Sequence, residues 1–138
     1  MKFKNKVVVV TGGAHGIGQA IVEDFRKEGA IVEVIDKTQG TYFVGDIGHK
    51  ETLEAFSSYV LEKHSHIDYL INNALPIMKG IDECSYEEFQ YALSVGVTAP
   101  FYLTKLFKDS FNKDAVIINI SSSRDRMSQA NTESYTAA

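Results

Sequence analysis

The sequence has 138 residues, of which 44% are hydrophobic and 23% charged, and its formal net charge at pH 7 is −4. This composition is typical of a folded globular domain and argues against a disordered chain. The acidic balance gives no electrostatic reason to expect nucleic acid or an anionic membrane as a partner.

The first part of the chain alternates between strand and helix patterns. The β-branched run at 7–10 predicts a strand buried on both faces of a parallel sheet. Apolar residues at helical spacing follow over Ile17–Phe25, and Gly29 marks the end of that helix. Two more strands are predicted at 31–35 and 42–44. The stretch KTQGT between these two strands is too short for a crossover helix, so we expect a loop and a thinly covered sheet face.

The second part continues the alternation. A helix is predicted over Leu53–Val60 and a fourth strand at 69–71. The pair Ser85 and Glu88 is a capping-box signature that opens a long helix over 86–111, and a fifth strand is predicted at 115–120. This order predicts one α/β domain over residues 1–138, with a doubly wound parallel sheet of about five strands.

The fifth strand, AVIINI, has the composition of a buried central strand, yet in this chain it would form an open sheet edge. We therefore expect the sheet to be incomplete and the C-terminal part of the domain to be missing.

A glycine-rich turn follows the first strand directly and precedes a helix. Its spacing is G-x-x-x-G-x-G, with Gly12, Gly16 and Gly18 at the glycine positions. Glycines allow a tight turn and a close backbone approach to a diphosphate, and the helix N-terminus offers free N–H groups to the phosphates. His15 and Ile17 lie in the same turn, where backbone contact with a cofactor is expected. The alternative is a flexible turn, but the strand–turn–helix context favours dinucleotide binding.

Asp36 stands at the end of the second strand, 36 − 18 = 18 residues after the last glycine. An acid at about that distance is expected to accept hydrogen bonds from the adenosine ribose hydroxyls. Its charge would repel a 2′-phosphate, so the sequence predicts NAD as the cofactor in preference to NADP. Lys37 weakens this preference without reversing it.

Taken together, these motifs resemble the short-chain dehydrogenase/reductase family over essentially the whole chain. Thr11–Gly18 matches the family's TGxxxGxG, and Asn72–Ala74 matches the first three residues of NNAG. The resemblance implies a Rossmann-like fold. It also implies cofactor contacts for Asp46 and Ile47 at the adenine and for Asn73 and Ala74 beside the nicotinamide half.

The resemblance also implies the catalytic pair. Among the three serines after the fifth strand, Ser122 lies 135 − 122 = 13 residues before Tyr135, a spacing like the family's. Ser122 would orient the substrate and Tyr135 would act as acid and base. The family's lysine falls at position 139, so we expect that the chain stops inside this motif and that the 138 residues alone are inactive.

The implied activity is hydride transfer between a nicotinamide cofactor and a small secondary alcohol or carbonyl compound. Two departures, Gly96 at the family's catalytic asparagine and Leu75 at the glycine of NNAG, keep an alternative open. That alternative is a non-catalytic NAD-binding protein, either a sensor or an inactive relative. The resemblance further implies a homo-oligomer, a dimer or a tetramer.

The remaining features are less informative. Cys84 is the only cysteine, and no signal peptide or transmembrane stretch is visible, so we expect a cytoplasmic protein. His64 and His66 lack a matched third ligand, and we predict no metal site.

Overall fold

The computed structural model describes residues 1–138, and its five parallel strands form one sheet in the order β3-β2-β1-β4-β5. The strands are β1 (Val7–Thr11), β2 (Ile31–Asp36), β3 (Phe43–Val44), β4 (Ile67–Asn72) and β5 (Phe111–Asn119). Every residue of the central strand β1 is buried, as expected for a parallel strand covered on both faces. The doubly wound, Rossmann-like α/β fold predicted from the sequence is confirmed.

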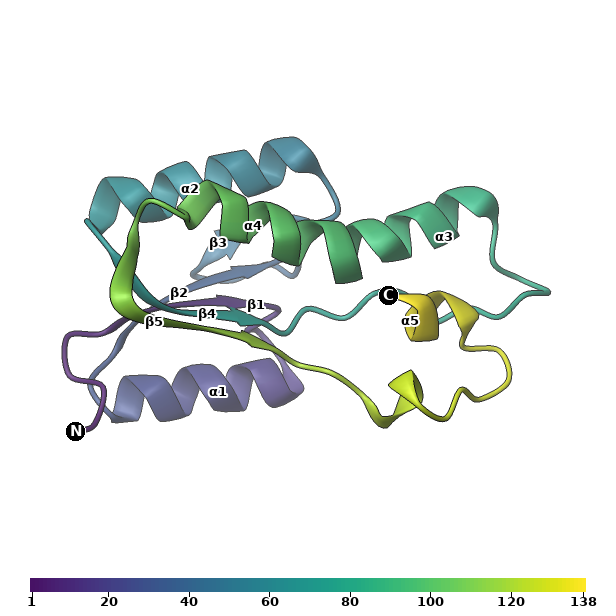
Figure 1. Ribbon diagram of the computed structural model, residues 1–138, viewed down its shortest axis with the longest axis horizontal. Coiled ribbons are helices and arrows are strands. Elements are labelled where there is room, and N and C mark those ends of the chain that lie inside the picture. The colour runs from purple at the N-terminus through teal and green to yellow at the C-terminus, as the bar shows by residue number, and fades with distance from the viewer.

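Helices cover the two faces of the sheet unequally. They are α1 (Gly16–Lys27), α2 (Lys50–Lys63), α3 (Tyr86–Leu93), α4 (Ala99–Phe107) and α5 (Glu133–Ala137). Figure 1 shows α2 and α4 on one face and α1 on the other. No helix joins β2 to β3, as the short connection predicted. Consequently the buried hydrophobic cluster on the α2 and α4 side has 13 residues, whereas the cluster on the α1 side has 6.

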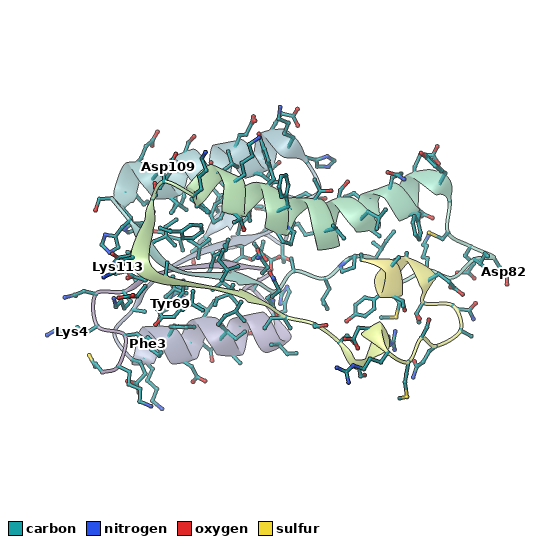
Figure 2. All side chains as sticks on the ribbon, viewed as in Figure 1. Phe3, Lys4, Tyr69, Asp82, Asp109 and Lys113 are labelled. Atoms are coloured by element: carbon teal, nitrogen blue, oxygen red, sulfur yellow. The ribbon has the colours of Figure 1, made fainter.

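The α1 side gains further cover from the N-terminal segment. The ring of Phe3 packs on Phe25 with a centroid distance of 4.6 Å and meets Tyr69 edge-on at 5.5 Å (Figure 2). Such aromatic pairs stabilise beyond the area they bury. The residues before β1 therefore belong to the packed domain.

A buried carboxylate ties three strands together at the amino ends of the sheet. The side chain of Asp68 on β4 is 4% exposed and accepts hydrogen bonds from the Val7 N–H, the Lys6 Nζ and the Asn112 Nδ2 at 2.9–3.0 Å. Burial alone would raise the pKa of Asp68, but the hydrogen bonds and the charge of Lys6 outweigh it and hold that pKa below its ordinary value. His66 Nε2 lies 3.3 Å from the same carboxylate. The carboxylate is therefore ionised in the folded protein at neutral pH.

The long helix predicted over 86–111 is present, but a π-helical segment interrupts it and it ends four residues early. The capping box of Ser85 and Glu88 is present and opens α3. A π-helical segment, η1 (Ser94–Thr98), then separates α3 from α4, and helical structure ends at Phe107. Pro100 has no N–H and its ring disfavours the regular register, and the Ala99 N–H donates to the Ser94 carbonyl five residues earlier.

Phe111, predicted as the helix end, instead begins β5, which runs to Asn119 and not to the predicted Ile120. β5 is one of the two edge strands, and its Val116, Ile117 and Ile118 are 39–42% exposed. The open apolar edge expected from the sequence is therefore present. Separately, none of the helices combines the length and the hydropathy that crossing a bilayer would require.

Candidate dinucleotide-binding and active site

A cavity of about 510 Å³ opens where β1, β2 and β4 end. Ligands of open α/β sheets bind at this carboxyl edge, where the strand order reverses. All ten residues that the sequence predicted as cofactor contacts line it: Gly12, His15, Gly16, Ile17, Gly18, Asp36, Asp46, Ile47, Asn73 and Ala74. The structure thus brings together residues that are more than sixty positions apart in the chain.

The glycine turn has the shape of a cradle. Gly12 and Gly16 have φ values of +67° and +52°, which side-chain-bearing residues rarely adopt. At Gly18, a Cβ atom would lie 2.0 Å from the Gly12 carbonyl oxygen and 2.4 Å from Asn73 Nδ2. The turn therefore packs against the start of α1 with no room for a side chain, and the free N–H groups of that helix end face the cavity.

Asn73 and Thr11 fasten this turn to the end of β4. Asn73 Nδ2 donates to the carbonyl oxygens of Thr11 and Gly12 at 3.2 and 2.9 Å. In return, Thr11 Oγ1 accepts from the N–H groups of Asn73 and Ala74 at 3.0 and 3.1 Å. These four bonds bridge two neighbouring strands and fix the floor of the cavity.

Asp36 lies at the far side of the same turn. One carboxylate oxygen accepts from the Ala14 N–H and the other from the Thr38 N–H, both at 3.0 Å. The His15 ring reaches Thr38 Oγ1 at 3.2 Å and closes over this corner. Each carboxylate oxygen has further lone pairs, so the side chain is positioned by the protein and can still accept from a ligand hydroxyl.

Asp46 has a partner that the sequence analysis missed. The Tyr91 hydroxyl donates to one Asp46 oxygen at 2.5 Å, and the Gly48 N–H donates to the other at 2.9 Å. A Cβ atom at Gly48 would lie 2.4 Å from the Tyr91 ring, so this glycine makes room for the tyrosine. Burial and the bond to Asp46 raise the pKa of Tyr91 far above its ordinary value, which keeps its hydroxyl protonated as a donor.

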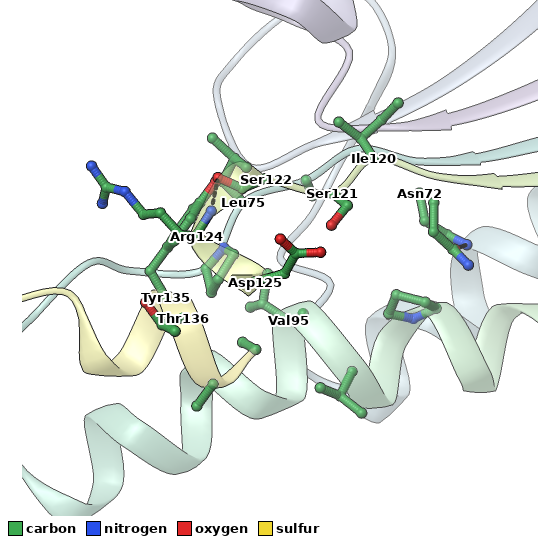
Figure 3. Close-up of a pocket in the computed structure, with 18 of the residues that line it drawn as sticks. Asn72, Leu75, Val95, Ile120, Ser121, Ser122, Arg124, Asp125, Tyr135 and Thr136 are labelled. Atoms are coloured by element: carbon green, nitrogen blue, oxygen red, sulfur yellow. Dashed lines mark hydrogen bonds between the residues drawn. The ribbon is translucent and has the colours of Figure 1, made fainter. Parts of the chain in front are cut away.

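A second cavity, of about 420 Å³, adjoins the first on the side of β5 and η1 (Figure 3). Ser122 and Tyr135 line both cavities, as does Leu75, whose side chain is 67% exposed. The Ser122 Oγ accepts from the Arg124 N–H at 3.3 Å, and the Arg124 guanidinium lies 5.5 Å from the centre of the Tyr135 ring. Three hydroxyl-bearing residues, Ser121, Ser122 and Tyr135, thus stand at the boundary between the cavities.

The inner end of this second cavity is lined by amides. Asn72 Nδ2 donates to Asn119 Oδ1 at 2.8 Å, whereas Asn72 Oδ1 is buried without a protein partner. Gly96 on η1 also lines this cavity, and a Cβ atom there would lie 2.6 Å from the Ala138 Cβ. Glycine at this position therefore allows close packing against the C-terminal residues.

Comparison of the chain with known proteins agrees with this combination of fold, glycine turn and neighbouring hydroxyls. The family model described as short chain dehydrogenase matches residues 6–138, and the chain belongs to the short-chain dehydrogenase family. An L-fucose dehydrogenase from Mus musculus is 34% identical over 151 residues, which cover 99% of this chain and 55% of the relative. The chain thus spans about half the length of the curated relatives it matches.

Two solved structures extend the comparison. An apo SCOR enzyme from Clostridium thermocellum superposes with a TM-score of 0.89 at 40% identity, covering 96% of this chain and 60% of that one. A metagenomic short-chain oxidoreductase in complex with NADP superposes with a TM-score of 0.87 at 26% identity, covering 99% of this chain and 70% of that one.

Proposed function

We propose that the protein is a nicotinamide-dependent oxidoreductase that interconverts a secondary alcohol and its carbonyl compound. The observation that carries this proposal is the shared boundary: Ser122 and Tyr135 line both the 510 Å³ cavity of the glycine turn and the adjoining 420 Å³ cavity. A cofactor in the first cavity and a substrate in the second would meet at these two hydroxyls. The dehydrogenase name of the mouse relative supports the same reaction class.

The first cavity fits a dinucleotide. Its volume lies within the range of about 300–1,000 Å³ that is usual for cofactor sites. Gly18 has no space for a side chain, and Gly12 and Gly16 have positive φ values that favour glycine. Backbone N–H groups, not side chains, would therefore face the expected diphosphate. When bound, the nicotinamide ring supplies the acceptor or donor of hydride.

The protein's own part is to hold the alcohol and to move a proton. Ser122 would hold the reacting oxygen by a hydrogen bond. Tyr135 would take the hydroxyl proton while the carbon loses its hydride, and would return the proton in the reverse direction. A tyrosine with an ordinary pKa of about 10 is a poor base at pH 7, so the reaction needs cationic neighbours that stabilise the phenolate.

We also propose that NAD is preferred over NADP. Asp36 is held by two backbone N–H groups at the corner where the ribose of the adenosine half would lie, and it would repel a 2′-phosphate. The NADP complex of the metagenomic relative makes this preference a point to test.

Calorimetric titration of the protein with NAD and NADP tests both proposals. We expect the wild-type protein to bind NAD more tightly than NADP. In Asp36→Ala the ratio of the two affinities should fall by at least about tenfold, which corresponds to about 1.4 kcal/mol of binding free energy. Asp82→Ala, at an exposed acid that lines neither cavity (labelled in Figure 2), is the matched control and should leave the ratio unchanged. Tighter NADP binding by the wild-type protein would overturn the cofactor preference, and binding of neither would overturn the function.

Two further expectations remain proposals. We propose that a homo-oligomer forms through the surface that includes Val97 on η1 and Phe101 on α4, which are 50% and 65% exposed. The cytoplasmic location stays a prediction for cell fractionation to test. The non-catalytic alternative receives no support from the relatives described above.

A further inference from the structure

The second cavity carries two ionisable side chains of opposite charge next to each other in the chain, Arg124 and Asp125. Their surroundings differ. The Arg124 guanidinium donates to the Met78 sulfur at 2.8 Å and to Gln129 Oε1 at 2.9 Å, and it lies over the Tyr135 ring. Figure 3 shows that it extends away from the middle of the cavity.

Asp125 has the opposite orientation. Its carboxylate points into the cavity, among side chains that include Ser121 and Val95 (Figure 3). It accepts no hydrogen bond from any protein group and makes no ion pair, although the backbone N–H of the same residue donates to the Ser122 carbonyl at 3.1 Å. That backbone bond belongs to the short helical turn Ser123–Asp125, which places the residue on the cavity wall. Asp125 is exposed to solvent, and the acceptor sites of its carboxylate are free of protein partners.

The other polar side chains on the wall of this cavity are neutral. They are hydroxyls and amides, among them Thr11, Asn72, Asn119, Ser121 and Thr136. A carboxylate in such a wall accepts strong hydrogen bonds from hydroxyl groups and repels another carboxylate. Substrates with several hydroxyls fit this pattern, and hydroxy acids do not.

Resting on the proposed function, we propose that the substrate is a neutral polyhydroxylated compound, a polyol or sugar. Its reacting hydroxyl meets Ser122 and Tyr135, and Asp125 accepts a hydrogen bond from a neighbouring hydroxyl. Asp125 is a specificity-determining residue in this scheme. It takes no part in proton or hydride transfer, so it changes which alcohol binds without changing the reaction itself.

The test compares three probes that share a small secondary alcohol. They are meso-2,3-butanediol, 2-butanol, which lacks the second hydroxyl, and lactate, which carries a carboxylate instead. Each is titrated into the native protein saturated with NADH, a state that cannot oxidise alcohols, so affinity is measured apart from turnover. We expect the diol to bind about tenfold tighter than 2-butanol, since a charge-assisted hydrogen bond is worth at least that factor, and lactate to bind weakest.

In Asp125→Asn and Asp125→Ser the advantage of the diol should fall to about threefold or less, the affinity for 2-butanol should stay the same, and lactate should gain. Neither change removes an internal contact, because the carboxylate has none. Asp109→Asn removes the same charge at an exposed site far from the cavity, between α4 and β5 (Figure 2), and should behave like the wild type.

Equal affinity for the diol and 2-butanol in the wild type, or an unchanged ratio in both Asp125 variants, would overturn this inference alone. Failure to bind NAD or NADH would overturn the proposed function, and this inference with it.

Discussion

Replacing Asp68 by asparagine tests whether the buried carboxylate at the amino ends of the sheet stabilises the fold. The change keeps the shape of the side chain but removes its charge and puts an NH₂ group among three donors. The N–H of Val7, a residue only 3% exposed, competes with Lys6 and Asn112 for the remaining oxygen. Leaving a buried donor unpaired costs about 1–3 kcal/mol, and Lys6 and Asn112 recover part of their loss in water because they are partly exposed.

We therefore expect Asp68→Asn to lower the free energy of unfolding by about 2–3 kcal/mol at pH 7. In urea titrations followed by circular dichroism, with a slope near 2 kcal/mol/M, the midpoint should fall by about 1–1.5 M. Asp109→Asn is the control for loss of an exposed charge and should shift the midpoint far less.

The pH dependence gives a second, independent check. Because the pKa of Asp68 is lowered in the folded state, its contribution is present above the unfolded pKa of about 3.9 and is lost as the pH falls through the folded pKa. The difference between wild type and Asp68→Asn should therefore be present at pH 7 to 8 and shrink below about pH 4. A loss of less than about 0.5 kcal/mol, or a difference that persists undiminished in acid, would refute this reasoning.

Two further predictions concern the glycine turn and the hydroxyl pair. Gly18→Ala should weaken NAD binding by more than about tenfold in calorimetry, because its Cβ would overlap the Gly12 carbonyl. At Gly16 there is free space for a Cβ, but the backbone φ is positive. Gly16→Ala should therefore chiefly lower the free energy of unfolding, by about 1–2 kcal/mol. Equal losses of affinity at both sites would contradict the steric argument. Tyr135→Phe in the native protein should lower NAD-linked turnover by about 10²–10⁴-fold with little change in NAD affinity, whereas the same change at exposed Tyr86 should leave both intact. Retained turnover in Tyr135→Phe would exclude it as the acid and base.

The parts of the site that could be predicted are those that the sequence encodes locally. The run at 7–10, the glycine spacing and Asp36 at the end of a strand each carry their own physical signal within a few residues. The carboxyl edge of a parallel sheet then brings them together, whatever the detailed packing. For this reason the ten predicted cofactor contacts lie around one cavity.

The rest depends on contacts between distant segments. The bond between Tyr91 and Asp46 joins residues 45 positions apart, and nothing in either local pattern distinguishes Tyr91 from a packing tyrosine. The end of the long helix was misplaced because Phe111 is apolar and suits the end of a helix or the start of a buried strand equally well. The position of Asp125 on the cavity wall likewise depends on the short turn after β5, which charge patterns do not reveal.

The π-helical segment between α3 and α4 has a consequence for the geometry of the whole cavity wall. A regular α-helix turns by about 100° per residue. A π-helix turns less per residue, so the rotation over five residues is smaller by roughly the angle of one α-helical residue. Because of this smaller rotation, the side chains of α3 point in other directions relative to those of α4 than they would in one continuous α-helix. Tyr91 reaches Asp46 at the cofactor cavity while Leu103 and Phe107 remain fully buried against the sheet. In a continuous α-helix of the same length, Tyr91 would swing by about a quarter turn and lose the carboxylate.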